Sequence, residues 1–75
     1  MAVQAQSDVE IEIIVNGESR VTAASSLEGL LEELELVGQR VATAINGEFV
    51  PSSSRPGRRL EVGDRIEIVS ARQGG

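Results

Sequence analysis

The sequence predicts an α+β domain in which a single mixed sheet packs on one helix. Three observations predict it. The chain has 75 residues, enough for one domain with one modest core. An alternating run at residues 9–15 and a β-rich run at residues 41–45 each end in an Asn-Gly dipeptide, and one leucine-rich stretch has helical spacing. The resulting order, β-β-α-β-β-β, favours a two-layer arrangement.

The first two strands are predicted as a hairpin. Residues 9–15 alternate, with Val9, Ile11, Ile13 and Val15 on one face and glutamates on the other. Asn16-Gly17 is typical of a two-residue hairpin turn. Residues 18–23 then return as a shorter, more polar strand, which we expect towards an edge of the sheet.

The helix is predicted from a capping box and a leucine stripe. Ser25 is the expected N-cap, with Glu28 at the third helical position. Gly38 stands where a C-terminal cap glycine is expected, and Gly29 permits close packing. The stripe has i, i+3, i+4, i+7 spacing and comprises Leu27, Leu30, Leu31 and Leu34. The exposed face carries Glu28, Glu32, Glu33 and Glu35.

The second half of the chain predicts three more strands. Residues 41–45 and 48–50 flank the turn Asn46-Gly47, and Pro51 ends the second of them. We expect residues 52–59 to be an exposed loop, residues 60–62 to make a brief apolar contact, and residues 65–69 to form the last strand. The first and last strands carry the cleanest Ile/Val alternation and are expected to be the best-buried pair.

The domain boundaries follow from these elements. Residues 1–8 are small and polar without a period, so we interpret them as a flexible leader. Residues 9–69 form the folded domain. Residues 70–75 are interpreted as a C-terminal tail ending in Gly-Gly, flexible because glycine lacks a Cβ.

Composition excludes several classes of function. The chain has no Cys or His, so thiolate catalysis, the usual general base and the usual soft metal ligands are excluded. Net charge is −5 and Phe49 is the one aromatic residue, which argues against a nucleic-acid or anionic-membrane partner. No apolar run could cross a bilayer and no signal-peptide pattern is present, so the chain is expected to be cytoplasmic.

The side chains offer little chemistry of their own. The glutamates of the first strand and the helix fall on solvent-exposed faces, and Ser52-Ser53-Ser54 has no His or Lys base to activate it. Arg55, Arg58 and Arg59 could bind a phosphate or an acidic loop, although a soluble loop is the simpler interpretation. We therefore predict no catalytic residue and no metal site.

The C-terminus is the remaining candidate site. Five residues reach about 16 Å beyond the last strand when extended. Gly74 would let the tail pass through a narrow tunnel, and side-chain-free Gly75 leaves its carbonyl open to attack. An α-carboxylate is ionised and unreactive at neutral pH, so another enzyme must first activate it, for example as a mixed anhydride with AMP.

Three stretches resemble the ubiquitin-like β-grasp sulfur carriers of the ThiS/MoaD kind, and the ThiS branch most. They are residues 13–18; the Ala-Ile-Asn-Gly-Glu-Phe-Val-Pro block at 44–51; and Val-Gly-Asp-Arg-Ile-Glu-Ile-Val at 62–69, followed by terminal Gly-Gly. The combination is more specific than any of its parts. The leader is longer than is usual in the family, and Ser52-Ser53-Ser54 replaces the frequent basic residue and Trp.

The resemblance implies a carrier that is a cosubstrate and not an enzyme, a monomer on its own, without a cofactor. An E1-like adenylyltransferase of the ThiF type would use Mg-ATP to adenylate Gly75. Sulfur donated through a persulfide would displace AMP and leave a thiocarboxylate. A thiazole synthase of the ThiG type would then take the sulfur for the thiazole ring of thiamine. Arg72, Gln73 and Gly74 would thread the partner's active site.

Three alternatives stay open at this point. The carrier could serve molybdopterin or another sulfur metabolite. A ubiquitin-like modifier joined to protein lysines would use the same terminus, although this chain has no Lys on which to build chains on itself. A plain β-grasp interaction module would make no use of its tail.

Overall fold

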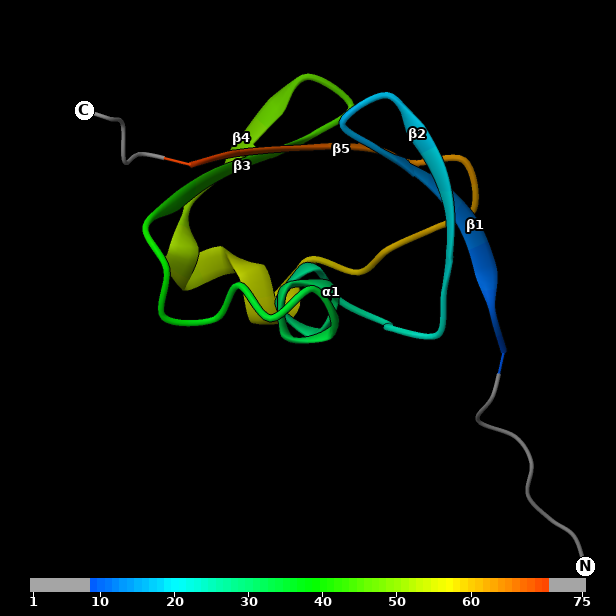
Figure 1. Cartoon of the computed structure of the whole chain (residues 1–75), viewed down its shortest axis with the longest axis horizontal. Helices are drawn as coiled ribbons and strands as arrows, with labels where there is room; N and C mark the ends of the chain where they lie inside the picture. Colours follow the sequence, from blue (N-terminus) through cyan, green and yellow to red (C-terminus); the bar gives the residue numbers. More distant parts are fainter. Residues whose placement is uncertain (1–8, 71–75) are drawn as a thin grey trace, which may run out of the picture.

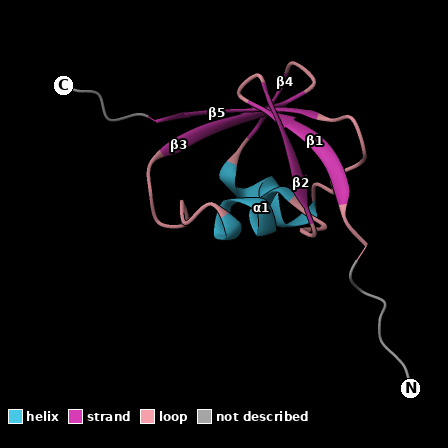
Figure 2. Cartoon of the chain, turned by 45° about the vertical axis from the view of Figure 1, so that its right-hand side comes forward, coloured by secondary structure: helices cyan, strands magenta, loops and turns pink. Residues whose placement is uncertain are grey.

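The computed structural model describes residues 9–70, and they form the predicted α+β arrangement (Figure 1). The leader and residues 71–75 lie outside the described residues. The sheet forms one layer, and the helices form the other (Figure 2). The elements are β1 (Ile11–Val15), β2 (Glu18–Thr22), α1 (Leu27–Glu33), β3 (Val41–Ile45), β4 (Glu48–Val50), the 3₁₀ helix η2 (Ser52–Gly57) and β5 (Arg65–Ser70).

The last strand lies at the centre of the sheet. The strand order is β2-β1-β5-β3-β4, with β1 and β5 parallel and the other neighbours antiparallel. The first and last strands are therefore neighbours, and they share two register pairs, Ile14↔Arg65 and Val15↔Ile66. The prediction that they are the best-buried pair is wrong, because each has one buried residue whereas β3 has two. The longer ladder of β5 is with β3, which has five pairs. The prediction that β2 lies at an edge is confirmed.

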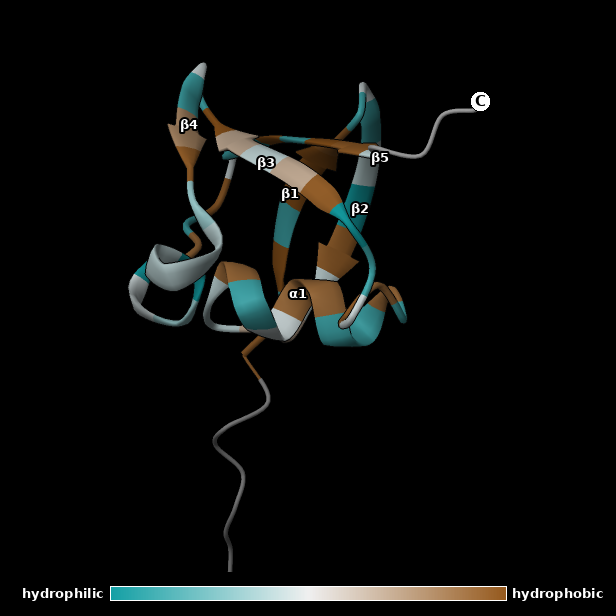
Figure 3. Ribbon diagram, turned by 90° about the vertical axis from the view of Figure 1, so that its left-hand side faces the viewer, coloured by the Kyte–Doolittle hydropathy of each residue, from teal (hydrophilic) through white to brown (hydrophobic). Residues whose placement is uncertain are grey.

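The core lies between the sheet and the helices. In Figure 3 the hydrophobic stretches of β1 and β3 stand across from α1. Leu31 is buried, and Leu34 packs against the core from its margin. Val9 was predicted to face inward, but it precedes β1 and is 73% exposed. The buried cluster consists of Ile13, Leu27, Leu30, Ile45, Val50, Leu60 and Ile66.

The helix begins one residue later than predicted. Ser26, and not Ser25, is the N-cap, and its hydroxyl accepts a hydrogen bond from the Gly29 amide at 3.1 Å. Glu28 is consequently at the second helical position, and the predicted capping box does not form. Ser25 instead accepts a backbone hydrogen bond from Leu60, which ties the start of the helix to the chain before β5. This tertiary bond explains the shift, since both serines suit an N-cap equally well.

The helix also ends earlier than predicted, without using Gly38. The amide of Leu36 donates to the Leu31 carbonyl and that of Glu35 to Glu32, which is the pattern of a Schellman motif. Glu35 has φ +63° and occupies the left-handed position that glycine usually takes. Gly38 has φ +88° but lies in the following turn. The leucine stripe would have allowed a longer helix, so its pattern alone could not predict this end.

The segment between β4 and β5 is more ordered than the predicted loop. Residues 52–57 form η2, and Arg55 turns inward, where its side chain is only 9% exposed. Its Nε donates to the Thr43 hydroxyl at 3.0 Å and its Nη2 to the Val41 carbonyl at 2.7 Å. Five guanidinium donors allow one side chain to tie η2 to β3 in this way. Leu60 makes the predicted apolar contact, whereas Val62 is 72% exposed.

Candidate functional site

The described part of the candidate site is the root of the C-terminal tail, where β5 ends at Ser70. Gly75, Gly74, Gln73 and Arg72, the predicted site residues, lie outside the described residues. What the structure defines is the support from which they extend. Because β5 lies between β1 and β3, the tail leaves the middle of the sheet.

Two neighbours hold the end of β5 in different ways. On one side, β3 pairs with β5 from Ile45↔Ile66 up to Val41↔Ser70. On the other side, β1 ends at Val15, and the side chain of Asn16 continues the ladder. Its amide nitrogen donates to the Ile68 carbonyl at 3.1 Å, and its oxygen accepts from the Ile68 amide at 2.8 Å. One side chain thus replaces a missing backbone partner.

An open groove of about 590 Å³ lies beside this end of β5. Its apolar lining includes Val15 of β1, Leu36 of the α1–β3 loop and Ile68 of β5. Ser70 lies on its rim, so the groove begins where the tail begins. Glu18 and Arg20 of β2 also line the groove and give it one acid and one base.

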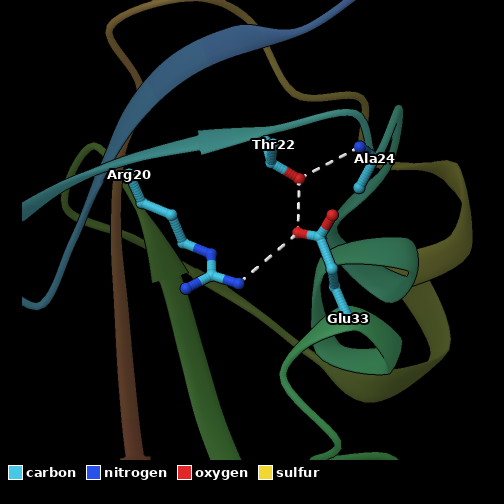
Figure 4. Close-up of polar contacts among 4 residues, drawn as sticks. All are labelled: Arg20, Thr22, Ala24 and Glu33. Atoms are coloured by element: carbon cyan, nitrogen blue, oxygen red, sulfur yellow. Dashed lines mark hydrogen bonds and ion pairs between the residues drawn. The ribbon is translucent and has the colours of Figure 1, made fainter. Parts of the chain in front are cut away.

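Arg20 belongs to a polar cluster that links β2 to α1 (Figure 4). Glu33 accepts a hydrogen bond of 2.6 Å from the Thr22 hydroxyl, which in turn accepts one from the Ala24 amide at 3.0 Å. Arg20 Nη2 stands 3.9 Å from the same Glu33 oxygen. Glu33 is exposed as predicted, but it also fastens the helix to an edge strand, which helical periodicity could not indicate.

The other candidates do not assemble into a site. Arg55 is committed to β3, so it cannot join Arg58 and Arg59 in a surface cluster for an anion. Arg58 turns its guanidinium to the carbonyl of Arg59. Within residues 9–70, no three His, Cys, Asp or Glu side chains are grouped to hold a metal ion. None of the helices in that range is long and apolar enough to cross a membrane.

Comparisons with known proteins agree on one family. The ThiS family model matches residues 9–75. The sulfur carrier protein ThiS of Thermus thermophilus is 36% identical over 61 residues, covering 81% of this chain and 95% of that protein. A crystal structure of the thiamine biosynthesis protein ThiS from Geobacter metallireducens has a TM-score of 0.72 at 25% identity, and the match covers 87% of this chain and 100% of that one.

A further relative is much longer. A thiazole synthase of Paramagnetospirillum magneticum is 39% identical over 66 residues, which cover 87% of this chain but 20% of that protein. The chain therefore spans about a fifth of the length of this relative. The fold, the matched residues and the two shorter relatives agree with one another. The chain belongs to the ThiS family of β-grasp proteins, whose members are small sulfur carriers and not enzymes.

Proposed function

We propose that this protein carries sulfur on Gly75 for the thiazole ring of thiamine. The observation that carries the proposal is that the family match extends through Gly75, immediately beyond a central strand that ends at Ser70. A tail anchored on β3 and Asn16 starts from a fixed point. A partner can therefore bind a rigid body and reach the carboxylate within the length of the tail, about 16 Å beyond the last strand.

The proposed chemistry has three steps. A ThiF-type adenylyltransferase with Mg-ATP joins a Gly75 carboxylate oxygen to the α-phosphorus, and pyrophosphate leaves. The terminal sulfur of a persulfide then attacks the acyl carbon and AMP leaves. Cleavage of the resulting S–S bond by a thiol, which is oxidised to a disulfide, releases the thiocarboxylate. The carrier supplies only the acyl group, which agrees with a chain that has neither Cys nor His.

The acceptor we propose is a thiazole synthase of the ThiG type. Support comes from the relative named thiazole synthase, a fifth of whose length matches this chain. A carrier-like segment joined to a synthase keeps the sulfur at a high effective concentration near its acceptor. Such a joined arrangement is expected where carrier and synthase act together.

The experiment is intact-mass measurement after incubation with Mg-ATP, adenylyltransferase and a persulfide donor. We expect one oxygen of the protein to be replaced by sulfur, and no change in a variant without Gly75. Gly74→Val should fold normally, since it follows the last strand, yet lose adenylation because its branched side chain fills a narrow tunnel. Gly74→Ala, with the smallest added side chain, is the matched control.

Other outcomes would identify the alternatives. Normal adenylation of Gly74→Val would contradict the narrow-tunnel explanation. Adducts of high mass linked through lysines of other proteins would indicate a modifier. Sulfur transfer to molybdopterin synthase, with none to thiazole synthase, would reassign the pathway and leave the carrier chemistry intact.

A further inference from the structure

The groove beside Ser70 is open to solvent at one end of the core. The sheet separates there, since β1 ends at Val15 while β5 continues to Ser70. Leu36 and Ile68 line the gap and are only partly buried. An apolar side chain from another molecule would gain free energy by covering them.

Arg20 makes this groove selective for a negatively charged group. Its Nε is buried and has no hydrogen-bond partner, and its Nη2 lies 3.9 Å from Glu33, too far for a hydrogen bond. The side chain is nevertheless 40% exposed, so a small rotation can present its donors to the groove. A guanidinium binds a carboxylate through two parallel hydrogen bonds. The missing partner of Arg20 is therefore best supplied by an Asp or Glu.

The chain's own tail is a poor occupant. Residues 71–75 contain no large apolar side chain, so they could not fill the apolar floor. The enzyme that activates Gly75 is a better candidate to occupy the groove. Because the tail reaches only about 16 Å beyond Ser70, an active site that holds Gly75 must stand close to the groove's rim.

We propose that the adenylating enzyme inserts an apolar side chain, followed by a carboxylate that pairs with Arg20, into this groove. The inference rests on the proposed function, since it concerns the enzyme that activates Gly75. Glu18, which also lines the groove, would meet a basic residue of that enzyme, so the two charges fix the orientation in which it docks. The tail would then enter the active site in one direction.

The test compares Arg20→Met with Arg59→Met. Methionine keeps most of the apolar stem and removes the charge. Both variants make the net charge −6 instead of −5. Arg59 is the control because it does not line the groove: its backbone forms an isolated β-bridge with Ser26 at the start of the helix. Dissociation constants for a purified ThiF-type adenylyltransferase are measured by calorimetry, and KM and kcat for the carrier by ATP–pyrophosphate exchange.

We expect Arg20→Met to raise the dissociation constant about tenfold or more, because it leaves a partner's carboxylate buried and unpaired. KM should rise with it while kcat stays unchanged, and Arg20→Lys should restore part of the affinity. Thermal unfolding of Arg20→Met should match the wild type, because the lost ion pair is long and exposed.

The remaining outcomes contradict either the inference or the proposed function. Equal binding by Arg20→Met, or equal weakening by Arg59→Met, would show that Arg20 contacts no partner carboxylate. Self-association of the wild type that Arg20→Met abolishes would assign the groove to a second copy. Wild-type protein that binds the enzyme but is not adenylated contradicts the proposed function alone, and the affinity of the variants still tests the groove.

Discussion

The two Asn-Gly turns have the same backbone but support β5 at opposite ends. Asn16 has φ +51° and Asn46 has φ +53°, and the glycine that follows each has φ +86°. Both asparagines also bind β5 through their side chains. Asn46 accepts from the Arg65 amide at 3.0 Å, at the start of the strand, whereas Asn16 binds both backbone groups of Ile68 near its end.

The surroundings of the two side chains differ. Asn46 also donates to a carboxylate oxygen of Asp64 at 3.0 Å, and Asp64 is only 8% exposed. The other oxygen of Asp64 accepts from the Glu61 amide at 2.9 Å, so this turn belongs to a network that closes the start of β5. The bonds of Asn16 lie at an exposed site. The difference indicates that the start of β5 is held firmly, while the root of the tail depends on β3 and one exposed side chain.

Replacement of each positive-φ residue by glycine tests this comparison, because glycine keeps the turn and removes only the side chain. Asn46→Gly should have the largest effect. It removes an exposed bond to the Arg65 amide, which water can replace, and it leaves a mostly buried carboxylate oxygen of Asp64 without its Asn46 partner. Hydrogen bonds to charged groups are the costlier to lose. We expect a loss of about 2–3 kcal/mol in the free energy of unfolding, measured by urea denaturation.

A double-mutant cycle with Asp64→Ala supplies the control. Because Asn46 and Asp64 share a bond, the two losses should add to more than the loss in the double variant. Additive losses would show that the network does not couple the two residues.

Asn16→Gly should cost less, about 1 kcal/mol, because water can replace its bonds to Ile68. Its effect should be local. Hydrogen exchange of the Ile68 amide should accelerate more than exchange of the Ile66 amide. Equal acceleration at both amides would show that the whole of β5 depends on Asn16, and the contrast between its two ends would be wrong.

Local sequence signals predicted the turns, the leucine stripe, the strand order along the chain and the edge position of β2. They depend on neighbouring residues, so a single sequence contains them. Sequence analysis missed contacts between distant elements. Nothing near Arg55 indicates that it binds Val41 and Thr43, and nothing near Asn16 indicates a bond to a strand 52 residues away.

Of the candidate site, too, sequence analysis predicted one part and missed another. The terminal Gly-Gly is visible in the sequence, and its role as the site stays a prediction, since residues 71–75 lie outside the described part of the chain. The groove was not predictable, because it arises where β1 ends before β5 does. The helix cap shifted to Ser26 because Ser25 is taken by Leu60, a residue far along the chain.

The third substitution, Glu35→Gly, should have the smallest effect and the opposite sign. Glu35 has φ +63° at the end of α1, as the two asparagines have in their turns, but it is exposed and is not an Asn, which tolerates this conformation better. Its negative charge also lies at the helix C-terminus, where the helix dipole disfavours it. Glycine removes both costs, and we expect a gain of up to about 1 kcal/mol in the free energy of unfolding, or about 4–8 °C in Tm.

Glu35→Ala is the control: it removes the charge but keeps the Cβ, so it should recover only the smaller electrostatic part. If glycine destabilised the protein here too, the Glu35 side chain would make stabilising contacts of its own. The contrast between Glu35 and the two asparagines, whose side chains hydrogen-bond to β5, would then not hold.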